Sequence, residues 1–515
     1  MSRLTGTATL LRLALRRDRV MLPVWLYASV GSLAATAVSF RRLYPTPASQ
    51  QEFAATVNAT DSLRAVYGSV HSGSIGGLTA WRMGTLGGVV VALMSFLLVI
   101  RHSRAEEEAG RLELLGAGAT GRTAPPAAAV STALLGNLLV GLLMPLVLIA
   151  LGEPAAGSFA FGLAVACCGL VFTGTAAVAA QVFETGRAAN GTCGALLGLA
   201  FLLRAADPSL SPLGWIEEVH AYGGDRWWTL APPLAAATAQ LALASALVAR
   251  RDLGAGLLPQ RPGPARAADR LRSPAALAWR LQRETLLGWS LGFLTAGTVF
   301  GGLAGGVRSL VGGSTQMLQV MQRLGGRPGV TDSYLATMAG LLGMAAAVYA
   351  VQAVLRLRSE EAEGRAEPLL ATPVSRLRWA AGHLLHPSLG SLALLLAGGL
   401  GLSAGAALSG VPRTSHLLGG TLAQAPAAWL AAAVALALIG LAPTRTPLAW
   451  GLLGAALLIS FVGPALNAGQ WLLDLSPFTH VPAFSVQAEP VLWLTALTAA
   501  LTLTGLTALQ RRDLT

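Results

Sequence analysis

Apolar runs of membrane-spanning length follow one another along almost the whole chain, and this pattern limits the possible folds more than any other feature. A transmembrane helix needs roughly 20 apolar residues. Hydrophobic residues make up 54% of the 515 residues, whereas charged residues make up only 12%, a composition outside the range of soluble globular proteins. We therefore predict an all-α polytopic membrane protein with about twelve transmembrane helices.

The arginines lie at the ends of these apolar runs rather than in a separate basic domain. The chain carries a net charge of +12, and this distribution follows the positive-inside rule, by which basic loops remain in the cytoplasm. We predict a multi-pass protein of the cell (inner or plasma) membrane with both termini cytoplasmic, in contact with membrane lipid and not with nucleic acid. The sequence contains no lysine, so it cannot contain a P-loop, because that motif requires one.

A short charged segment occurs twice, each time between two apolar runs. We call residues 104–115 (RAEEEAGRLELL) the first knuckle and residues 358–369 (RSEEAEGRAEPL) the second knuckle. Alignment of their glycines pairs Arg104 with Arg358, Glu106 with Glu360, Glu107 with Glu361, Gly110 with Gly364, Arg111 with Arg365 and Glu113 with Glu367. The repeated charge order favours two equivalent cytoplasmic docking elements for a soluble partner. The alternative is a solvated turn held by weak local salt bridges.

Further landmarks recur in the same order in the two halves of the chain. The tripeptide SPL at 211–213 matches SPF at 476–478, and RRDL at 250–253 matches RRDL at 511–514. Each half holds six predicted spans, an even number, so the repeats are expected to have parallel topology, related by an axis along the membrane normal. We predict a first six-helix repeat at residues 1–253, a cytoplasmic linker at 254–278 and a second six-helix repeat at 279–515.

Two predicted external segments begin with the repeated Ser-Pro dipeptide. We call Ser211–Trp228 the first SP segment and Ser476–His480 the second SP segment. They supply candidates for an external gate: Ser211, Pro212, Trp215, Trp227, Trp228, Ser476, Pro477 and Phe478. An aromatic belt at the membrane interface is the alternative explanation, because indole rings favour that environment.

Candidates for a hydrophobic substrate cavity lie in spans next to the knuckles, or in the short fifth span and its counterpart in the second repeat. They are Met94, Phe96, Phe201, Gln352 and Phe461. Helix packing and lipid contact are competing explanations for each of them. The three cysteines lack the spacing of a zinc site, so we predict no metal site, and we identify no catalytic residue.

The predicted spans hold no acidic residue near their centres. A charged group at the centre of a spanning helix is costly and usually serves ion or proton coupling. An ion-coupled secondary drug transporter is therefore disfavoured, and the energy source is expected to lie on another chain. The absence of clustered His, Asp or Cys argues against a membrane-embedded enzyme. A non-transporting membrane scaffold or sensor remains a further alternative.

The knuckles, the SP segments, the RRDL ends and the duplicated six-span plan together resemble the permease subunits of type-two ABC exporters. The likeness is closest to the polyketide-antibiotic, tetronasin-resistance branch. This resemblance implies a transport subunit, not an enzyme, that effluxes hydrophobic drugs or polyketide-type antibiotics. It also implies a separate cytoplasmic ABC ATPase, two copies per chain, which carries ATP and Mg and docks on the knuckles as coupling helices. No cofactor is expected on this chain itself.

Overall fold

The computed structural model describes residues 4–59, 64, 67–112, 120–252, 254–258, 265–266, 268–311, 330–411, 414–462, 469–481 and 488–512. Within these ranges the chain is helical and contains no β-sheet, only an isolated bridge between Phe183 and Leu258. Eleven of the described helices are long and apolar enough to cross a membrane. The prediction of an all-α polytopic membrane protein is therefore confirmed.

The helix at the place of the eleventh predicted span is shorter than the others. α20 (Leu448–Val462) is strongly apolar, but it has only 15 residues. At 1.5 Å per residue it extends about 22 Å, less than the roughly 30 Å hydrocarbon core of a bilayer. Residues 463–468, which follow α20, lie outside the described part of the chain.

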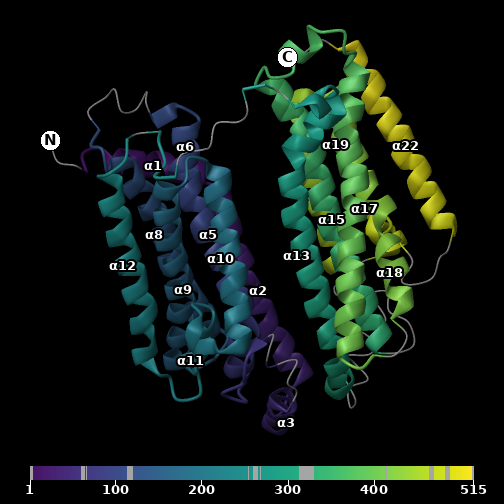
Figure 1. Cartoon of the computed structure of the whole chain (residues 1–515). Helices are drawn as coiled ribbons and strands as arrows, with labels where there is room; N and C mark the ends of the chain where they lie inside the picture. Colours follow the sequence, from purple (N-terminus) through teal and green to yellow (C-terminus); the bar gives the residue numbers. More distant parts are fainter. Residues whose placement is uncertain are drawn as a thin grey trace. The chain divides into compact units, whose positions relative to one another are not determined.

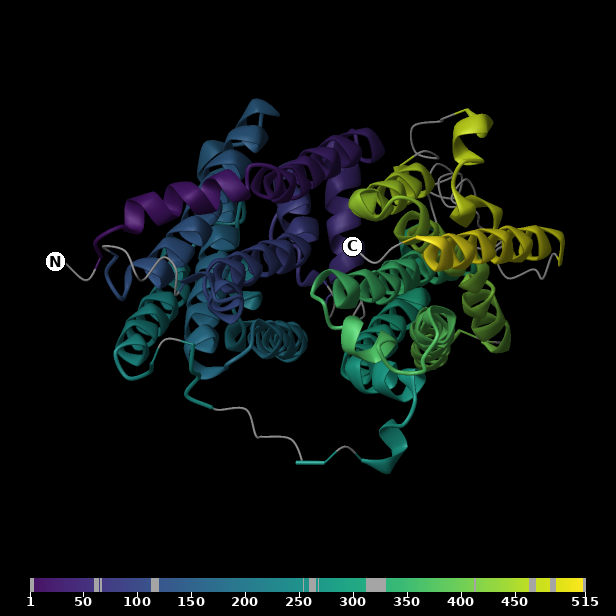
Figure 2. The ribbon, with the colours of Figure 1, turned by 90° about the horizontal axis from the view of Figure 1, so that it is seen from above.

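The chain forms two compact units, Met1–Gly263 and Pro264–Thr515, and the division falls within residues 254–278, where a linker is predicted. Figure 1 shows each unit as a bundle of long helices, and Figure 2 shows the bundles end on. The helices of the first unit are α1 (Thr7–Arg17), α2 (Met21–Leu43), α3 (Pro47–Asn58), α5 (Ile75–His102), α6 (Arg104–Glu108), α8 (Ala124–Ala150), α9 (Ala155–Val182), α10 (Gly186–Ala206), α11 (Gly214–Glu218) and α12 (Ala231–Val248).

The second unit has a similar order of elements. Its helices are α13 (Pro274–Val311), α15 (Val330–Ala362), α16 (Glu367–Leu370), α17 (Arg376–Leu408), α18 (Ser415–Leu422), α19 (Ala425–Leu441), α20, α21 (Gln470–Leu473) and α22 (Ala488–Arg511). Within the first unit α5 contacts α2, α8, α9 and α10, and α9 contacts α12. Within the second unit α15 contacts α13, α17, α19 and α20, and α19 contacts α22. Each unit therefore has the same internal packing scheme.

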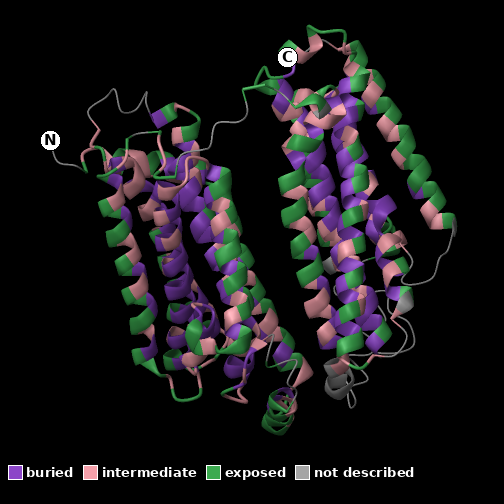
Figure 3. Ribbon diagram, viewed as in Figure 1, coloured by how far each residue is buried: buried purple, intermediate pink, exposed green. Residues whose placement is uncertain are grey.

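Burial differs strongly among helices of similar hydropathy. In the most apolar stretches of α5 and α9, 72% and 78% of the residues are buried, against 22% for α12 and 11% for α22. Figure 3 shows the exposed residues along α12 and α22 in green and the buried interiors of the two bundles in purple. Apolar side chains on the outside of a bundle are expected where the solvent is lipid. α5 and α9 thus form the core of the first unit.

Glycines allow α13 and α17 to pack closely over much of their length. A methyl group added at Gly297 or Gly301 of α13 would lie less than 3.0 Å from backbone atoms of Gly398 or Leu402 of α17. Likewise, a methyl group added at Gly405 of α17 would meet the backbone of α13. Small residues that bring two backbones together are a usual means of joining helices in membranes, where the hydrophobic effect does not drive helix association.

Gly301 and its neighbour Gly302 provide a direct test of this packing. Gly301→Ala places a methyl group against the Leu402 carbonyl oxygen, so we expect overpacking to lower the Tm of the detergent-solubilised protein by roughly 2 to 10 °C. Gly302→Ala is the matched control, because a Cβ there meets open space and alanine has the higher helix propensity. Equal Tm values for the two variants in a thermal unfolding scan would contradict the close contact.

Candidate functional site

Each knuckle continues a long helix and then turns at a glycine. α5 leads into α6, whereas the second knuckle begins on the last turns of α15. Gly110 and Gly364 have φ angles of 69° and 70°, in the left-handed region that residues with a Cβ seldom adopt. In the described structure nothing lies within 4 Å of a Cβ built at either position. The turn conformation, not crowding, therefore explains why both knuckles have glycine here.

In the first knuckle the carboxylate of Glu107 forms a bidentate ion pair with Arg251. Arg251 Nη2 donates to Glu107 Oε1 at 2.6 Å and Arg251 Nη1 donates to Oε2 at 2.8 Å. Arg104 Nη1 donates to the same Oε2 at 2.5 Å. The side chains of Arg251 and Glu107 are only 8% and 5% exposed. Arg251 follows α12 and also donates to Gln181 of α9 at 2.7 Å, so the pair joins the knuckle to two spans.

The second unit contains the equivalent ion pair. Arg512 Nη2 donates to Glu361 Oε2 at 2.6 Å, and Arg358 Nη1 lies 3.3 Å from the same oxygen. The side chains of Arg512 and Glu361 are 14% and 2% exposed. Glu361 aligns with Glu107, and Arg512 aligns with Arg251 in the repeated RRDL motif. Each knuckle is therefore held to the end of the last helix of its own unit by the same buried contact.

The preceding carboxylates, Glu106 and Glu360, close the two turns. Arg111 Nε donates to Glu106 Oε2 at 2.8 Å, and Arg365 Nε donates to Glu360 Oε2 at 2.9 Å. Both arginines follow the turn glycine by one residue, so these bonds span the turn. In the first unit Glu106 also pairs with Arg17 at the end of α1, at 2.8 Å. This contact attaches the amphipathic N-terminal helix to the first knuckle.

A buried acid also fixes the end of α1 against α5. Asp18 is fully buried, and its carboxylate contacts the imidazole of His102. Arg101 Nη2 lies 3.4 Å from Asp18 Oδ1. A buried carboxylate requires such partners, because removal of the charge from water is costly. The base of the first knuckle is thus a network of ion pairs that includes α1, α5, α9 and the end of α12.

The knuckle residues of the predicted docking surface fall into two groups. One group has side chains in the buried ion pairs: Arg104, Glu106, Glu107, Glu360 and Glu361. The other group lies at or near the surface of the turns: Gly110, Arg111, Arg358, Gly364, Arg365 and Glu367. Glu113 lies outside the described residues. A partner can reach only the second group, and the role of all twelve in ATPase coupling stays a prediction.

The serines of the two SP segments occupy similar buried positions. Ser211 Oγ donates to the carbonyl oxygen of Ala200 in α10 at 2.6 Å, and Ser476 Oγ donates to that of Ala456 in α20 at 3.0 Å. Each serine therefore anchors its segment to the short preceding helix. Of the other gate candidates, Phe478 is buried, Pro212, Trp215 and Pro477 are half-buried, and Trp227 and Trp228 are exposed. Gating stays a prediction, and the exposed indoles also suit an aromatic belt.

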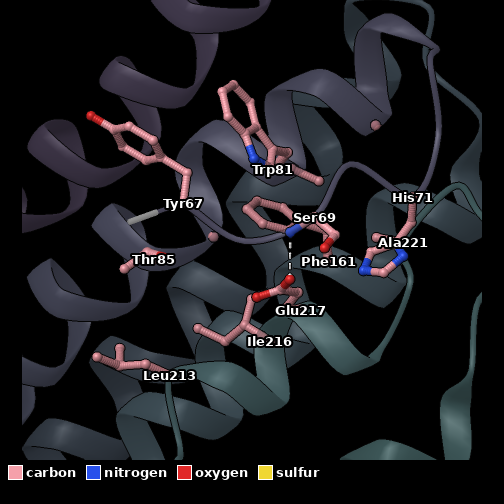
Figure 4. A pocket seen from close by; sticks show the side chains of 13 residues that line it. Tyr67, Ser69, His71, Trp81, Thr85, Phe161, Leu213, Ile216, Glu217 and Ala221 are labelled. Carbon is pink, nitrogen blue, oxygen red and sulfur yellow. Dashed lines mark hydrogen bonds between the residues drawn. The ribbon is translucent and has the colours of Figure 1, made fainter. Parts of the chain in front are cut away.

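The first SP segment covers a small cavity with a volume of about 30 Å³ (Figure 4), enough for about one or two water molecules. Its aromatic lining consists of Tyr67, Trp81, Phe161 and His71. The carboxylate of Glu217 accepts a hydrogen bond from the backbone N–H of Ser69 at 2.6 Å and lies 3.5 Å from Arg204 Nη2. Burial raises the pKa of Glu217. The carboxylate holds the loop before α5 against the SP segment.

Two histidines lie face to face beside this cavity. The ring centroids of His71 and His220 are 3.7 Å apart. Burial and then the nearby His220 and Arg226 lower the pKa of His71 to about 4. Burial and then Arg226 lower the pKa of His220, whereas Glu218 opposes this shift. His220 and Asp225 have φ angles of 50° and 38°, which are strained for residues with a Cβ. The stacked rings hold this strained loop while both are neutral.

Of the five cavity candidates, three belong to the first unit and two to the second. Met94 and Phe96 are in the buried core of the first unit, and Phe201 packs against that core. Gln352 is an exposed residue of α15 in the second unit, and the side chain of Phe461 lies outside the described part. Their role in a substrate cavity stays a prediction.

Sequence reasoning missed the functional partners of the knuckles. The RRDL motif served only as a marker of the repeat, although its second arginine pairs with the second glutamate of the knuckle in both units. The signal was available, because an arginine and a glutamate recur together in both halves. The loop partners of Glu217 had no such signal, since neither Ser69 nor Arg204 belongs to a recognised motif.

Removal of the arginine partner is expected to leave a buried carboxylate without its main counter-charge. Arg251→Gln breaks the pair with Glu107 and Arg512→Gln breaks the pair with Glu361. Because breaking a buried pair costs about 3 to 5 kcal/mol, we expect each variant to lower the Tm of the purified protein by roughly 6 °C or more. Thermal unfolding followed by size-exclusion fluorescence measures this change.

The preceding arginines of the two RRDL motifs provide matched controls. Arg250 and Arg511 are exposed, so Arg250→Gln and Arg511→Gln make the same chemical change without removing a buried charge. Both controls should unfold within about 1 to 2 °C of the wild type. If Arg250→Gln and Arg251→Gln unfold at the same temperature, the buried pair does not stabilise the knuckle.

The histidine stack predicts that acid loosens the first SP segment. His71 is neutral in the packed loop down to about pH 4, whereas a free imidazole has a pKa near 6.5. Between these values the released loop binds more protons than the packed one, so the packed form loses stability as the pH falls. We expect faster hydrogen–deuterium exchange in residues 67–74 and 214–226 at about pH 5 than at about pH 7, after correction for intrinsic rates.

The double variant His71→Phe with His220→Phe keeps two stacked rings but removes both titrating groups. Its exchange in these segments should no longer become faster as the pH falls from about 7 to about 5. His480→Phe is the control, because His480 lies in the second SP segment and contacts Trp493. Persistence of the pH dependence in the double variant would show that other groups open the loop.

Comparison with known proteins identifies the family of this chain. The family described as the C-terminal domain of the multidrug efflux system permease Rv1217c matches residues 271–510. The multidrug efflux system permease protein Rv1217c of Mycobacterium tuberculosis is 40% identical over 523 aligned positions, which cover 99% of this chain and 95% of that protein. These matches support a multidrug efflux permease, not the tetronasin-resistance branch to which the sequence resemblance pointed. The chain, a multi-pass membrane permease, therefore belongs to the multidrug efflux system permease family.

Proposed function

We infer that this chain is the membrane subunit of an ATP-driven ABC exporter in the plasma membrane, and that it moves hydrophobic drugs out of the cell. A separate cytoplasmic ABC ATPase, two copies per chain, docks on the two knuckles and carries the ATP and Mg. The observation that carries this proposal is the duplicated ion pair that joins each knuckle to the last helix of its unit. The name of the relative, a multidrug efflux system permease, supports the choice of substrate class.

The two groups of knuckle residues suit the two tasks of a coupling element. The exposed turn around Gly110 and Gly364 is accessible to a partner. At the buried end of each knuckle, Glu107 pairs with Arg251 and Glu361 pairs with Arg512. These ion pairs connect the turn directly to the last helix, so a displacement of the turn moves that helix as well. A turn that served only to reverse the chain would not need two buried carboxylates attached to a distant arginine in each unit.

The position of the acidic residues favours an external energy source. In the described spanning helices, acids lie within the end turns, as Asp332, Glu360 and Glu489 do, or in the segment of α13 before its most apolar stretch, as Glu284 does. Ion-coupled secondary transport usually relies on a charged group inside the membrane. That mechanism and a non-transporting scaffold are the competing functions. The first predicts transport without the ATPase, and the second predicts that cells with both subunits do not lower their drug accumulation.

Docking can be tested without disturbing the buried pairs. Ala109 and Glu363 precede the turn glycines and are exposed, so Ala109→Trp combined with Glu363→Trp places a bulky ring on each turn. We expect co-purification of the ABC ATPase encoded beside the permease to fall roughly tenfold or more, as for a clash at the centre of an interface. Pull-down in detergent and ATP turnover of the complex in nanodiscs measure the effect.

Ala48→Trp makes the same substitution on exposed α3, which precedes α5 at the end remote from its knuckle. It should leave ATPase binding and turnover at the wild-type level. Normal ATPase binding in the double knuckle variant would show that the knuckles are not the docking surface. Drug efflux that follows a proton gradient in vesicles without the ATPase would instead support secondary transport.

A further inference from the structure

The second unit contains a groove between α15, α17, α19 and α22 that no predicted cavity residue lines. Its volume is about 180 Å³. For comparison, an engineered apolar protein cavity of about 150 Å³ accepts a benzene molecule. The groove is therefore large enough for one substituted aromatic ring, in contrast to the water-sized cavity below the first SP segment.

The groove lies at the depth of the hydrocarbon core. Thr498 and Thr502 of α22 line it, and about 13 Å of helix separates Thr502 from Arg511, which the positive-inside rule places at the membrane surface. Between the groove and this surface, α19 and α22 are in close contact, because a Cβ at Gly440 would lie less than 3.0 Å from the Gly505 carbonyl oxygen. An occupant of the groove therefore comes from the bilayer.

A proline and a tryptophan shape the wall formed by α17 and α19. Pro387 lies inside α17 and lines the groove, and it lacks the N–H that a helix requires at this position. Trp429 of α19 lies beside it, and its indole Nε1 donates to Ser391 Oγ at 2.9 Å and to the Ser388 carbonyl oxygen at 3.2 Å. The indole ring is thus fixed against α17, and its N–H is already used.

Two of the three hydroxyl groups that line the groove present an acceptor, and not a donor, to an occupant. Ser388 Oγ donates its hydrogen to the Leu384 carbonyl oxygen at 3.0 Å, and Thr498 Oγ1 donates to the Leu494 carbonyl oxygen at 2.8 Å. A hydroxyl oxygen whose hydrogen is used in this way retains lone pairs that can accept. The lining therefore combines an aromatic face with acceptors and offers no spare donor from these side chains.

We propose that this groove binds a hydrophobic small molecule with one aromatic ring and an O–H or N–H donor, taken up from the bilayer. A lipid acyl chain has no donor for these oxygens, whereas a phenol or aromatic amine satisfies them while its ring packs on Trp429. The assignment of this molecule as an export substrate rests on the proposed function. The binding of this molecule does not depend on the proposed function, because the groove belongs entirely to the permease.

The corresponding helix pair of the first unit is filled by protein. There Gln240 of α12 packs against Gly174 of α9, and its Nε2 donates to Thr175 Oγ1 at 3.1 Å. The side-chain amide of Gln240 thus fills the space between α9 and α12 and provides a hydrogen-bond donor there. The equivalent helices of the second unit, α19 and α22, leave that place to a ligand.

Binding can be measured on the purified full-length permease in nanodiscs without any ATPase. The protein is labelled with 5-fluorotryptophan, and the ¹⁹F resonance of Trp429 is assigned by its absence in Trp429→Phe. 4-Chlorophenol is the donor-bearing probe, and 4-chloroanisole is the same ring with the O–H capped. We expect a saturable shift of the Trp429 resonance, with 4-chlorophenol binding about two- to tenfold more tightly than 4-chloroanisole at equal concentration in the bilayer, the usual effect of one hydrogen bond.

Thr498→Val removes one of the acceptors at nearly constant volume and should lower the preference for the phenol. Thr495→Val is the matched control on the exposed face of α22 and should preserve it. A second experiment tests for lipid in the groove and uses phosphatidylcholine that carries a nitroxide on its acyl chain. Broadening of the Trp429 resonance that the phenol does not relieve, or equal affinity for the two probes in the wild type, would overturn the proposal in favour of lipid or unspecific apolar binding. Either result would leave the ATPase docking experiment unaffected.

Discussion

The architecture of both units depends on one interaction, a buried carboxylate–guanidinium pair at the base of each knuckle. Two charges withdrawn from water destabilise the fold unless each finds a geometrically good partner. Glu107 meets this condition with a bidentate pair to Arg251, and one carboxylate oxygen of Glu361 pairs with Arg512. Since the arginine follows the last helix of the unit, the pair joins elements that are far apart in sequence. The first and last parts of each bundle are held together by it.

This arrangement explains why the charge order of the knuckles is repeated. The second glutamate of each knuckle must face the arginine at the end of the unit, and the first glutamate must face the arginine after the glycine. The spacing of these charges is therefore set by internal geometry. The exposed part of the turn is free to differ, since Ala109 aligns with Glu363. The central ion pair recurs in both units, whereas the pair of Glu106 with Arg17 is described in the first unit.

The sequence was sufficient for the helical membrane fold and for the position of the knuckles, because hydropathy and arginine placement act along the chain. It was not sufficient for the burial of individual residues. Met94 and Gln352 both lie in apolar helices, yet one is buried in the core and the other is exposed, since hydropathy does not specify which helix face meets a neighbour. Likewise, the pairing of Glu217 with Ser69 joins segments that no periodic pattern relates.

The duplicated and the unduplicated features divide along a physical line. Contacts that hold a unit together, such as the knuckle pairs and the buried serines of the SP segments, occur in both halves. Other described features belong to one unit each. The histidine stack and its strained loop belong to the first unit, and the acceptor-lined groove belongs to the second, where Gln240 has no amide counterpart in the groove. A duplicated framework of ion pairs therefore leaves each half free to differ where a small molecule would bind.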